Sequence, residues 1–553
     1  MIDNYLDEPE DISTPALPPN HLSPANQSAH STGLARAALL IASGNIASRI
    51  LGLVREIVIA NLFGATGLVS AFRVAQIIPT MLYDLLIGGM VSSALVPIFS
   101  EQAEKDRAEL WHLASLLLSL AVIVLAVVVF IVELAAPQLA GLMASGFDSF
   151  DPTLLPATVR LIRITTPAVL FLSLSGIVTG LLHALKRFAL PAFTAATFNL
   201  TIVGVALLGV HNFGWGVETL AGGLLLGALF QLLLQLPALR DARFRFVFNL
   251  RHPVLRRIGK LYLPIILGLA ISAVAIALDR RFASFTGERS IAWMQYATTI
   301  VQFPLGLVSA AISLAILPTL SRLAVTSDTL PEFIATLAGG LRLVLILMIP
   351  ATVALFILAE PIVRLLFEHG DFTVLDTQQT GLALRFYLLG LTFAAIDQPL
   401  IFAFYARQNT LTPALVGLLG VGFYLVAALL PTLFRPMQMI DLVLANSVQL
   451  TGHALVMLWL ISRLAPLRGH SLGVTTLKAG LAALIMALGL WGADLGLSSW
   501  LLTGPLLGEV IFVGVLSAWG GLVYFLMMGL LRVPELRLLL SLARRFWPKS
   551  ISF

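Results

Sequence analysis

The stretch that decides the fold is residues 48–100, which begins SRILGLVRE at 48–56 and ends ALVPIFS at 94–100. It reads as two membrane-spanning helices, and it carries Arg49, Arg55, Glu56, Arg73 and Asp84. A charged side chain inside the hydrocarbon region costs several kcal/mol and is tolerated where it faces a partner or a water-filled cavity. We therefore expect this helix pair to line a polar cavity in a helical bundle, and its arginines predict an anionic ligand.

The composition places the whole chain in a membrane. Of its 553 residues, 58% are hydrophobic and 11% are charged, and the mean hydropathy is +0.95. Soluble domains contain about 25% charged residues, so we expect an all-α polytopic membrane protein. The absence of cysteine excludes disulfides and thiolate metal sites. The histidines show no metal-ligand spacing and no phosphate-binding loop follows a strand, so we expect no enzyme, no catalytic residue, no metal and no nucleic-acid partner.

Fourteen apolar runs are each long enough, at roughly 20 residues, to cross a bilayer. They fall near 34–62, 70–98, 111–135, 160–183, 190–211, 217–239, 261–285, 291–320, 333–358, 380–405, 411–434, 440–462, 474–496 and 506–531. With a cytoplasmic N-terminus, almost all loop Lys and Arg residues lie on the cytoplasmic side, and only Arg289, Arg364 and Arg435 lie outside. This asymmetry predicts 14 spans with both termini cytoplasmic.

A weak internal repeat predicts two lobes. ALVPIFS at 94–100 is echoed by AILPTLS at 315–321, and HALK at 183–186 is echoed by FYAR at 404–407, both at an offset of 221 residues. Six spans return the chain to its starting side, so the repeat predicts two pseudo-symmetric six-helix lobes of the same orientation, with the ligand between them. Pro79 and Gly88 in the second run, and Pro304 and Gly306 in the eighth, predict bends at matching places.

The predicted domain organisation follows from the repeat. It comprises a disordered cytoplasmic tail at 1–33, a first lobe at 34–239, a basic linker at 240–260, a second lobe at 261–463, a C-terminal helix pair at 464–531 and an amphipathic cytoplasmic tail at 532–553. The linker holds Arg240, Arg243, Arg245, Arg251, Arg256, Arg257 and Lys260. One interpretation is an anchor on anionic lipid, and the other is an amphipathic surface helix that transmits motion between the lobes.

The charged residues of the first two runs are the main candidates for ligand binding. Guanidinium groups bind phosphate bidentately, which favours Arg49 and Arg55 as anion ligands. The alternatives are that Arg55 snorkels or pairs with Glu56, and that Arg49 makes a structural bond to a carbonyl or to Asp84. Asp84 lies in mid-helix and needs a partner, for which Arg49 or Arg55 is the natural choice. Arg73 lies near the outer end, where snorkelling and ligand contact are both open.

Asp279 and Arg280 complete the candidate set of substrate-binding residues. They lie near the outer end of the run at 261–285. Adjacent residues on a helix point about 100° apart, so the two side chains do not face the same direction. We expect Asp279 to pair with an arginine of the cavity.

Eight short motifs, in the same order along the chain, resemble the MurJ (MviN) family of lipid II flippases in the MOP exporter superfamily. They are SRILGLVRE at 48–56, LFGA at 62–65, SSALVP at 92–97, KRFALPAF at 186–193, FASF at 282–285, LPTLS at 317–321, LFEHGDFT at 366–373 and FYARQ at 404–408. The resemblance implies a 14-helix, two-lobe fold with an arginine-lined central cavity, and Arg49 and Arg55 match family arginines of the first helix.

The resemblance also implies a function. The expected activity is translocation of an undecaprenyl-pyrophosphate-linked peptidoglycan precursor, lipid II, from the inner to the outer leaflet of the bacterial cytoplasmic membrane by alternating access. No bound cofactor is expected, and the membrane potential or a monovalent cation is the candidate energy source. The expected partners are this lipid-linked precursor, anionic membrane lipid and the cell-wall synthesis machinery.

Several positions depart from the family pattern. The departures are Tyr83-Asp84 for an arginine pair in the second helix, Ser70 for an acid, Gly88 for a glutamate, and Thr298-Thr299 for an Asp-Arg pair in the eighth helix. Arg73 and Arg280 are the candidates to compensate for the missing cations. The departures leave two alternative functions open: an exporter of another lipid-linked oligosaccharide or of a drug-like cation, and a membrane scaffold that transports nothing.

Overall fold

The computed structural model describes residues 24–249, 251–325, 327–464, 469–501 and 506–536, and all regular elements in these ranges are helices. The predicted all-α class is therefore confirmed for the described residues. The elements of the first half are α1 (Pro24–Phe63), α2 (Gly67–Tyr83), η1 (Asp84–Gly88), η2 (Val91–Leu95), α3 (Val96–Lys105), α4 (Arg107–Ala144), η3 (Ser145–Ser149), α5 (Leu154–Thr165), α6 (Ala168–Ala184), α7 (Ala189–Ala192), α8 (Thr194–Phe213), α9 (Glu218–Gln235) and η4 (Leu236–Leu239).

The second half continues the same pattern of long helices joined by short turns. Its elements are α10 (Pro253–Ser284), α11 (Ser290–Pro304), η5 (Leu305–Ser309), α12 (Ala310–Leu323), η6 (Ser327–Thr329), α13 (Leu330–Ile357), α14 (Ala359–Phe367), α15 (Val374–Ala406), α16 (Leu411–Leu429), η7 (Leu430–Leu433), α17 (Met439–Leu464), α18 (Leu472–Leu501) and α19 (Leu506–Leu530).

The helices are long and apolar enough to make this a multi-pass membrane protein. Twelve helical stretches of the described residues pass that test, and a thirteenth results if Pro253–Leu263 and Gly268–Ser284, which meet at 53°, form one span. The exact count of 14 stays a prediction. Helix α1 begins at Pro24, so residues 24–33 of the predicted disordered tail are helical, whereas residues 1–23 and 537–553 lie outside the described part of the chain.

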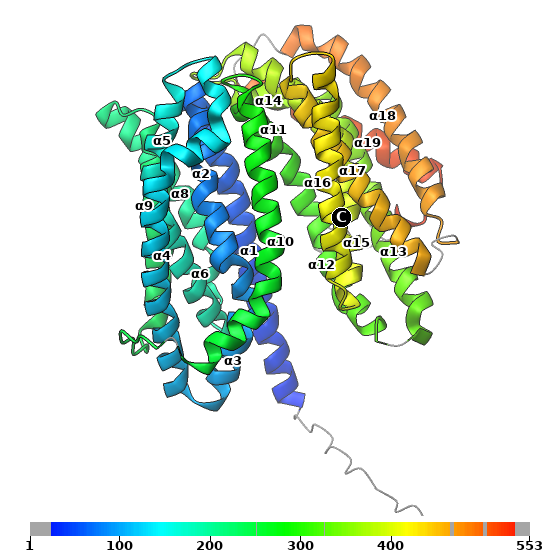
Figure 1. The fold of residues 1–553 in the computed structure, drawn as a ribbon. Helices are drawn as coiled ribbons and strands as arrows, with labels where there is room; N and C mark the ends of the chain where they lie inside the picture. Colours follow the sequence, from blue (N-terminus) through cyan, green and yellow to red (C-terminus); the bar gives the residue numbers. More distant parts are fainter. Residues whose placement is uncertain (1–23, 250, 326, 465–468, 502–505, 537–553) are drawn as a thin grey trace, which may run out of the picture.

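Two groups of helices lie side by side (Figure 1). Helices α1 to α9 form one group, and α11 to α17 form the other, with α18 packed against α13 and α19. Helix α10 stands between the groups, where it contacts α4 and the turns η1, η2 and η3 on one side and α11, α16 and α17 on the other. The arrangement resembles the predicted two lobes, although α10 also packs against the first group.

The second span and the span that begins with α11 are both interrupted by π-helical turns. In the first group the turns η1 and η2 follow α2, and in the second group η5 follows directly after Pro304. A π-turn places an extra residue in the helical ladder and is a common cause of a bend. The bends predicted at Gly88 and at Pro304 therefore coincide with irregular turns in both lobes.

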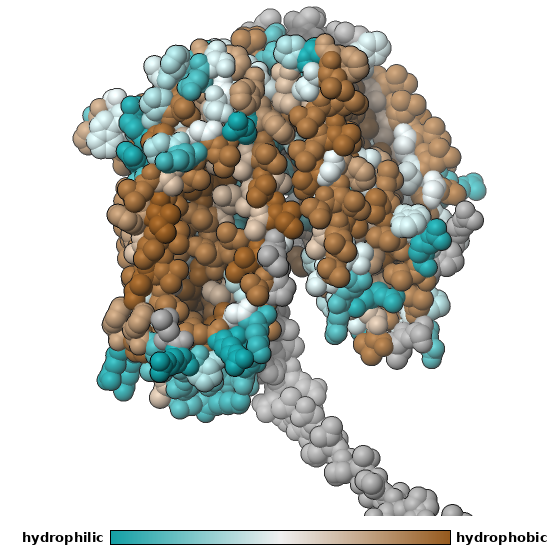
Figure 2. Space-filling view, viewed as in Figure 1, coloured by the Kyte–Doolittle hydropathy of each residue, from teal (hydrophilic) through white to brown (hydrophobic). Residues whose placement is uncertain are grey.

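The two lobes touch at one end, which we call the closed end. Here the Asp371 N–H donates to the carbonyl oxygen of Asn61 at 3.0 Å, and the Tyr296 hydroxyl donates to the carbonyl of Gly64 at 2.9 Å. At the opposite end, where α3 ends and α10 begins, the surface is hollowed between the lobes (Figure 2). We call this the open end.

Two glycines allow the backbones of the two lobes to approach each other at the closed end. Gly64 has φ +60° and Gly370 has φ +61°, a backbone region that disfavours residues with a Cβ. A Cβ on Gly64 would lie 2.4 Å from the carbonyl oxygen of Asp371, and a Cβ on Gly370 would lie 2.1 Å from that of Asn61. Each lobe therefore contributes one glycine to the contact, where a side chain would not fit.

The basic linker is not a surface helix between η4 and α10. Residues 240–249 and 251–252 form turns and irregular chain, and the predicted linker residues 253–260 are the first two turns of α10. The interpretation as an amphipathic surface helix is thus wrong for 240–249, where two backbone N–H groups bond to serines of α4. Asp241 is held by a bidentate ion pair with Arg187 at 2.6 and 2.8 Å, and this guanidinium holds the pKa of the Asp241 carboxyl below its usual range.

Substituting Gly370 with alanine should open the closed end. An alanine in this left-handed conformation costs about 1–2 kcal/mol and its Cβ collides with Asn61. The natural chain has no cysteine, so Ser290→Cys, at a buried position of α11 with 1% exposure, introduces a single thiol there. Its labelling by a maleimide should accelerate about fivefold or more in the Gly370→Ala background.

A matched control is Gly422→Ala on α16, where a Cβ would meet open space. It should leave the labelling rate of Cys at position 290 unchanged. Equal labelling rates in the Gly370→Ala and Gly422→Ala backgrounds would contradict the role of Gly370 in the contact.

Candidate functional site

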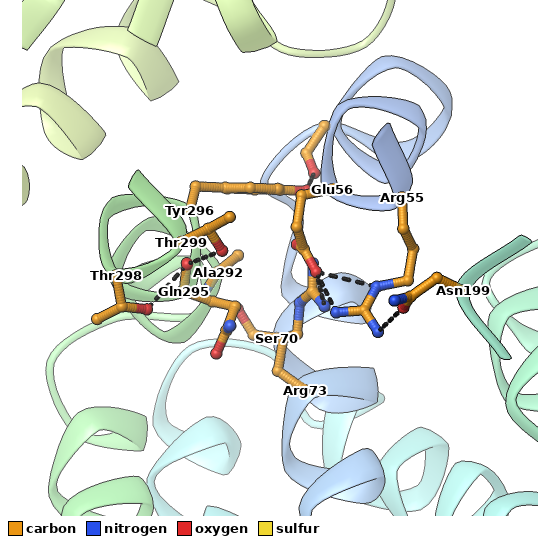
Figure 3. A network of polar contacts seen from close by, with 11 residues as sticks. Arg55, Glu56, Ser70, Arg73, Asn199, Ala292, Gln295, Tyr296, Thr298 and Thr299 are labelled. Atoms are coloured by element: carbon orange, nitrogen blue, oxygen red, sulfur yellow. Dashed lines mark hydrogen bonds and ion pairs between the residues drawn. The ribbon is translucent and has the colours of Figure 1, made fainter. Parts of the chain in front are cut away.

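A carboxylate bound by two arginines lies where α1 and α2 meet (Figure 3). Glu56 accepts hydrogen bonds from Arg55 Nη2 at 2.7 Å and Nε at 3.2 Å, and from Arg73 Nη1 at 3.2 Å. Arg73 Nη2 donates to its second oxygen, so both oxygens are used. Glu56 and Arg73 are 1% and 0% exposed, while the side chain of Arg55 keeps 21% exposure. One positive charge is left over in this triad.

Arg55 is held from its other side by α8. Its Nη1 donates to Asn199 Oδ1 at 3.0 Å, and Asn199 Nδ2 in turn donates to the Ser48 carbonyl oxygen at 3.3 Å. Glu56 and Asn199 thus fix the guanidinium plane from two directions, as Figure 3 shows. A guanidinium whose position is fixed before a ligand arrives loses less side-chain entropy on binding.

Arg73 contacts residues of the closed end. Its guanidinium carbon lies 5.7 Å from the ring centre of Tyr296, whose hydroxyl bonds to the Gly64 carbonyl. Nearby, the Ser70 hydroxyl accepts the Ala292 N–H at 3.2 Å. The snorkelling interpretation of Arg73 is wrong, because the side chain is completely buried, and its position behind Glu56 favours a structural role over direct ligand contact.

A polar cavity of about 240 Å³ lies between α1 and α11, next to the triad. From α1 it is lined by Arg49, Arg55 and Glu56, and from α11 by Gln295, Thr299, Gln302 and Phe303. Its wall is therefore made by one helix from each lobe. Two guanidinium groups and several uncharged donors are the chemistry that binds an anion with multiple oxygens.

Arg49 depends on a glycine of the other lobe. A Cβ on Gly306, in the π-turn η5, would lie 1.9 Å from Arg49 Nη1, so a larger residue there would push the guanidinium aside. No carboxylate lies within ion-pair distance of Arg49 among the described residues. The predicted pairing of Arg49 with Asp84 is thus wrong, and Arg49 keeps its charge available to the cavity.

An apolar cavity of about 340 Å³ adjoins the polar one. Both are lined by Leu53, Thr299 and Phe303, and the apolar one continues along α13 and α14 to Ser517 on α19. A molecule with a charged head and a long apolar tail can therefore place the head against α1 and the tail toward α19.

The other predicted site residues lie apart from the triad. Asp84 is exposed on η1, and Tyr262 donates to its backbone carbonyl at 3.2 Å. Asp279 accepts a hydrogen bond from Tyr424 at 2.7 Å and lies 3.9 Å from Arg280. Among the described side chains, none of Asp84, Asp279 and Arg280 has a hydrogen bond or ion pair to Arg49, Arg55 or Arg73. The expected pairing of Asp279 with a cavity arginine is wrong, because the tyrosine takes that place.

The sequence reasoning missed Asn199 and the polar face of α11. Gln295, Thr299 and Gln302 are spaced by four and three residues, so they share one face of a helix and could have been found by that spacing. Asn199 had no such signal, since its contact with Arg55 joins residues 144 apart in the chain. No group of three or more potential metal-ligand side chains occurs in the part of the chain that the structure describes.

Two helical lobes with a polar cavity at their interface are the architecture that many membrane transporters share. The family model described as "Lipid II flippase MurJ" matches residues 59–507. The chain therefore belongs to the MurJ family, as the motifs predicted.

Individual relatives agree with the family match. The chain is 31% identical over 414 residues to the lipid II flippase MurJ of Burkholderia cenocepacia, covering 73% of this chain and 79% of the relative. It is 31% identical over 397 residues to a probable lipid II flippase MurJ of Vibrio cholerae, covering 70% and 75%.

Solved structures support the fold. A structure described as lipid II flippase MurJ in an inward closed conformation aligns with a TM-score of 0.75 at 24% identity, covering 89% of this chain and 98% of that one. An inward-facing multidrug transporter of the MATE family, in the MOP superfamily, aligns with a TM-score of 0.61 at 15% identity, covering 75% and 95%. Both alignments agree with the helical fold described above.

Replacing Glu56 with glutamine should destabilise the protein. It leaves the fully buried Arg73 without its charge partner, and breaking a buried ion pair from one side costs about 3–5 kcal/mol. The double variant Glu56→Leu, Arg73→Met should be more stable than Glu56→Gln, since it leaves no lone charge. Thermal unfolding of the detergent-purified protein measures both effects.

The control is Glu332→Gln, because Glu332 is exposed at the start of α13. Its unfolding temperature should match that of the natural chain. If Glu56→Gln unfolds at that same temperature, the triad does not stabilise the junction of α1 and α2.

Proposed function

We propose that this protein is a flippase that moves lipid II from the inner to the outer leaflet of a bacterial cytoplasmic membrane. It acts as a transporter and not as an enzyme. The observation that carries the proposal is the junction of two cavities: Arg49 and Arg55 line a polar space that continues into an apolar one. A lipid-linked pyrophosphate has the matching chemistry, and membership of the MurJ family supports this choice of cargo.

In this proposal the pyrophosphate binds to Arg49 and Arg55. Arg55 is already oriented by Glu56 and Asn199. Arg49 precedes it by about 1.7 turns of α1, or about 9 Å along the helix axis. Thr299 and Gln302 of α11 can donate to the remaining oxygens. The polyprenyl chain occupies the apolar cavity toward α19, where it stays in contact with lipid.

Transport then requires the closed end to open and the open end to close. The contacts of Gly64 and Gly370 keep one end shut in the present conformation, and the π-turns η1, η2 and η5 are the points at which the helices facing the cavity can bend. The membrane potential can bias this exchange, because one charge moved across 100 mV is worth about 2.3 kcal/mol. A monovalent cation is the other candidate energy source.

We propose that the open end faces the cytoplasm. The basic loops with Arg187, Arg257 and Lys105 lie at this end, and an excess of Lys and Arg marks cytoplasmic loops. Both termini are then cytoplasmic. In this orientation the linker contacts the anionic inner leaflet, and the cell-wall synthesis machinery receives the cargo on the other side.

The alternative functions have less support. A drug-like cation is disfavoured by a cavity in which two guanidinium groups meet a single carboxylate. Another lipid-linked oligosaccharide would fit the same cavities, but the family and its curated relatives carry the name lipid II flippase. A scaffold without transport activity would have no use for an arginine that a glycine of the other lobe accommodates.

The natural chain should replace the flippase of a bacterium depleted of its own. The expected result is restored growth and restored accessibility of lipid II at the outer face of the membrane. The assay measures labelling of lipid II by a membrane-impermeant reagent. A chain that is confirmed in the membrane and yet restores neither readout would contradict lipid II as the cargo.

In the same assay, Arg49→Ala and Arg55→Ala should each reduce accessible lipid II by about tenfold or more. A hydrogen bond to a charged group contributes about 1.5–3 kcal/mol, and the remaining arginine cannot hold the pyrophosphate alone. The control is Arg322→Ala, because Arg322 is exposed at the end of α12 and should transport normally. Full transport by both Arg49→Ala and Arg55→Ala would refute the site.

A further inference from the structure

The linker after η4 bonds to α4 through two of its backbone N–H groups. The Arg245 N–H donates to Ser115 Oγ at 3.1 Å, and the Val247 N–H donates to Ser119 Oγ at 3.1 Å. Two residues of extended chain cover about 6.6 Å, and four residues of α-helix cover about 6.0 Å. The spacing of the two serines therefore matches the spacing of alternate N–H groups, and α4 acts as a template for the linker.

The linker carries an alternating pattern of aromatic and basic side chains. Phe244, Phe246 and Phe248 alternate with Arg243 and Arg245 along the sequence. Phe244 packs edge-on against Trp111 of α4, with ring centres 5.9 Å apart. Phe246 and Phe248 are 75% and 57% exposed, which suits contact with a lipid interface better than contact with water.

A cavity of about 380 Å³ lies under this segment. Its walls are leucine and valine side chains of α4, α6, α9 and η4, and the linker closes it with Phe244, Arg245 and Phe246. Exposed apolar residues, Val122 on α4 and Leu236 on η4, stand at its rim. The cavity shares no lining residue with the two cavities beside α1, and all of its walls come from the first lobe and the linker.

The positive charge at this cavity has no counter-charge among the residues that the structure describes. In the described ranges, no carboxylate lies within ion-pair distance of Arg243 or Arg245, although Arg187 and Arg257 of the same end both have acidic partners. An unpaired arginine at the edge of an apolar cavity selects a ligand that has an anionic group beside an apolar chain.

We propose that this cavity binds one anionic glycerophospholipid of the adjacent leaflet. One acyl chain enters between α4, α6 and α9, and the phosphate lies on Arg245, with Arg243 beside it. The site lies at the open end of the first lobe, where apolar surface gives way to polar surface (Figure 2). Headgroup phosphates and acyl chains meet at that depth of a bilayer. The bound lipid ties the linker to the three helices.

Native mass spectrometry of the full chain tests this site. The protein is purified from vesicles of phosphatidylethanolamine and phosphatidylglycerol, and retained phosphatidylglycerol is counted. Arg245→Gln should lower its retention about fivefold, the effect of one arginine near an anionic membrane surface. The control is Arg251→Gln, because Arg251 is an exposed arginine of the same linker that does not line the cavity; it should retain the lipid as the natural chain does.

A second variant tests whether the cavity binds the acyl chain of the lipid. Val122→Trp fills the rim of the cavity and should displace the lipid, whereas Val127→Trp, an exposed valine of the same helix outside the cavity, should not. Unchanged retention in Arg245→Gln, or in Val122→Trp, overturns the proposal. Displacement of phosphatidylglycerol from the natural chain by undecaprenyl phosphate shows the wrong occupant and also overturns it. The readout involves no transport, so it stands or falls separately from the flippase function.

Discussion

The bond between Glu56 and two arginines is the constraint on which the cavity depends. Both oxygens of this buried carboxylate are used, one by Arg73 alone and one by Arg55 and Arg73 together. Because Arg73 also lies against Tyr296 of the other lobe, a single carboxylate connects the closed end with the arginine that faces the cavity. A buried charge network of this kind contributes little net stability, and its effect is to place Arg55 in one orientation.

Sequence patterns predicted the helical, multi-pass class of the protein, because the length of an apolar run is a local property. The helix class, the polar first helix pair and the irregular turns near Gly88 and Pro304 all follow from residues close together in the chain. The prediction that Asp84 pairs with Arg49 or Arg55 was wrong because α2 ends in π-turns. These turns change the direction in which the residues after Tyr83 point. A constant helical period cannot anticipate that change.

Contacts between distant segments explain the remaining differences. Asn199 lies 144 residues from Arg55, and nothing in its surroundings indicates that pair. The Ser70 hydroxyl accepts the Ala292 N–H of the other lobe, and these two residues are 222 apart in the chain. A local sequence pattern does not show a contact between such distant residues.

The glycine at position 306 has a consequence for when the cavity can hold an anion. The guanidinium of Arg49 fits against the backbone of the second lobe only while the lobes stand as they do here. As they part, Arg49 and the polar residues of α11 move away from each other. The polar cavity takes its walls from both lobes, so the set of groups that faces the headgroup is then incomplete. Arg49 is exposed already in the present conformation, so the change lies in the distance between the two walls and not in the solvent access of Arg49.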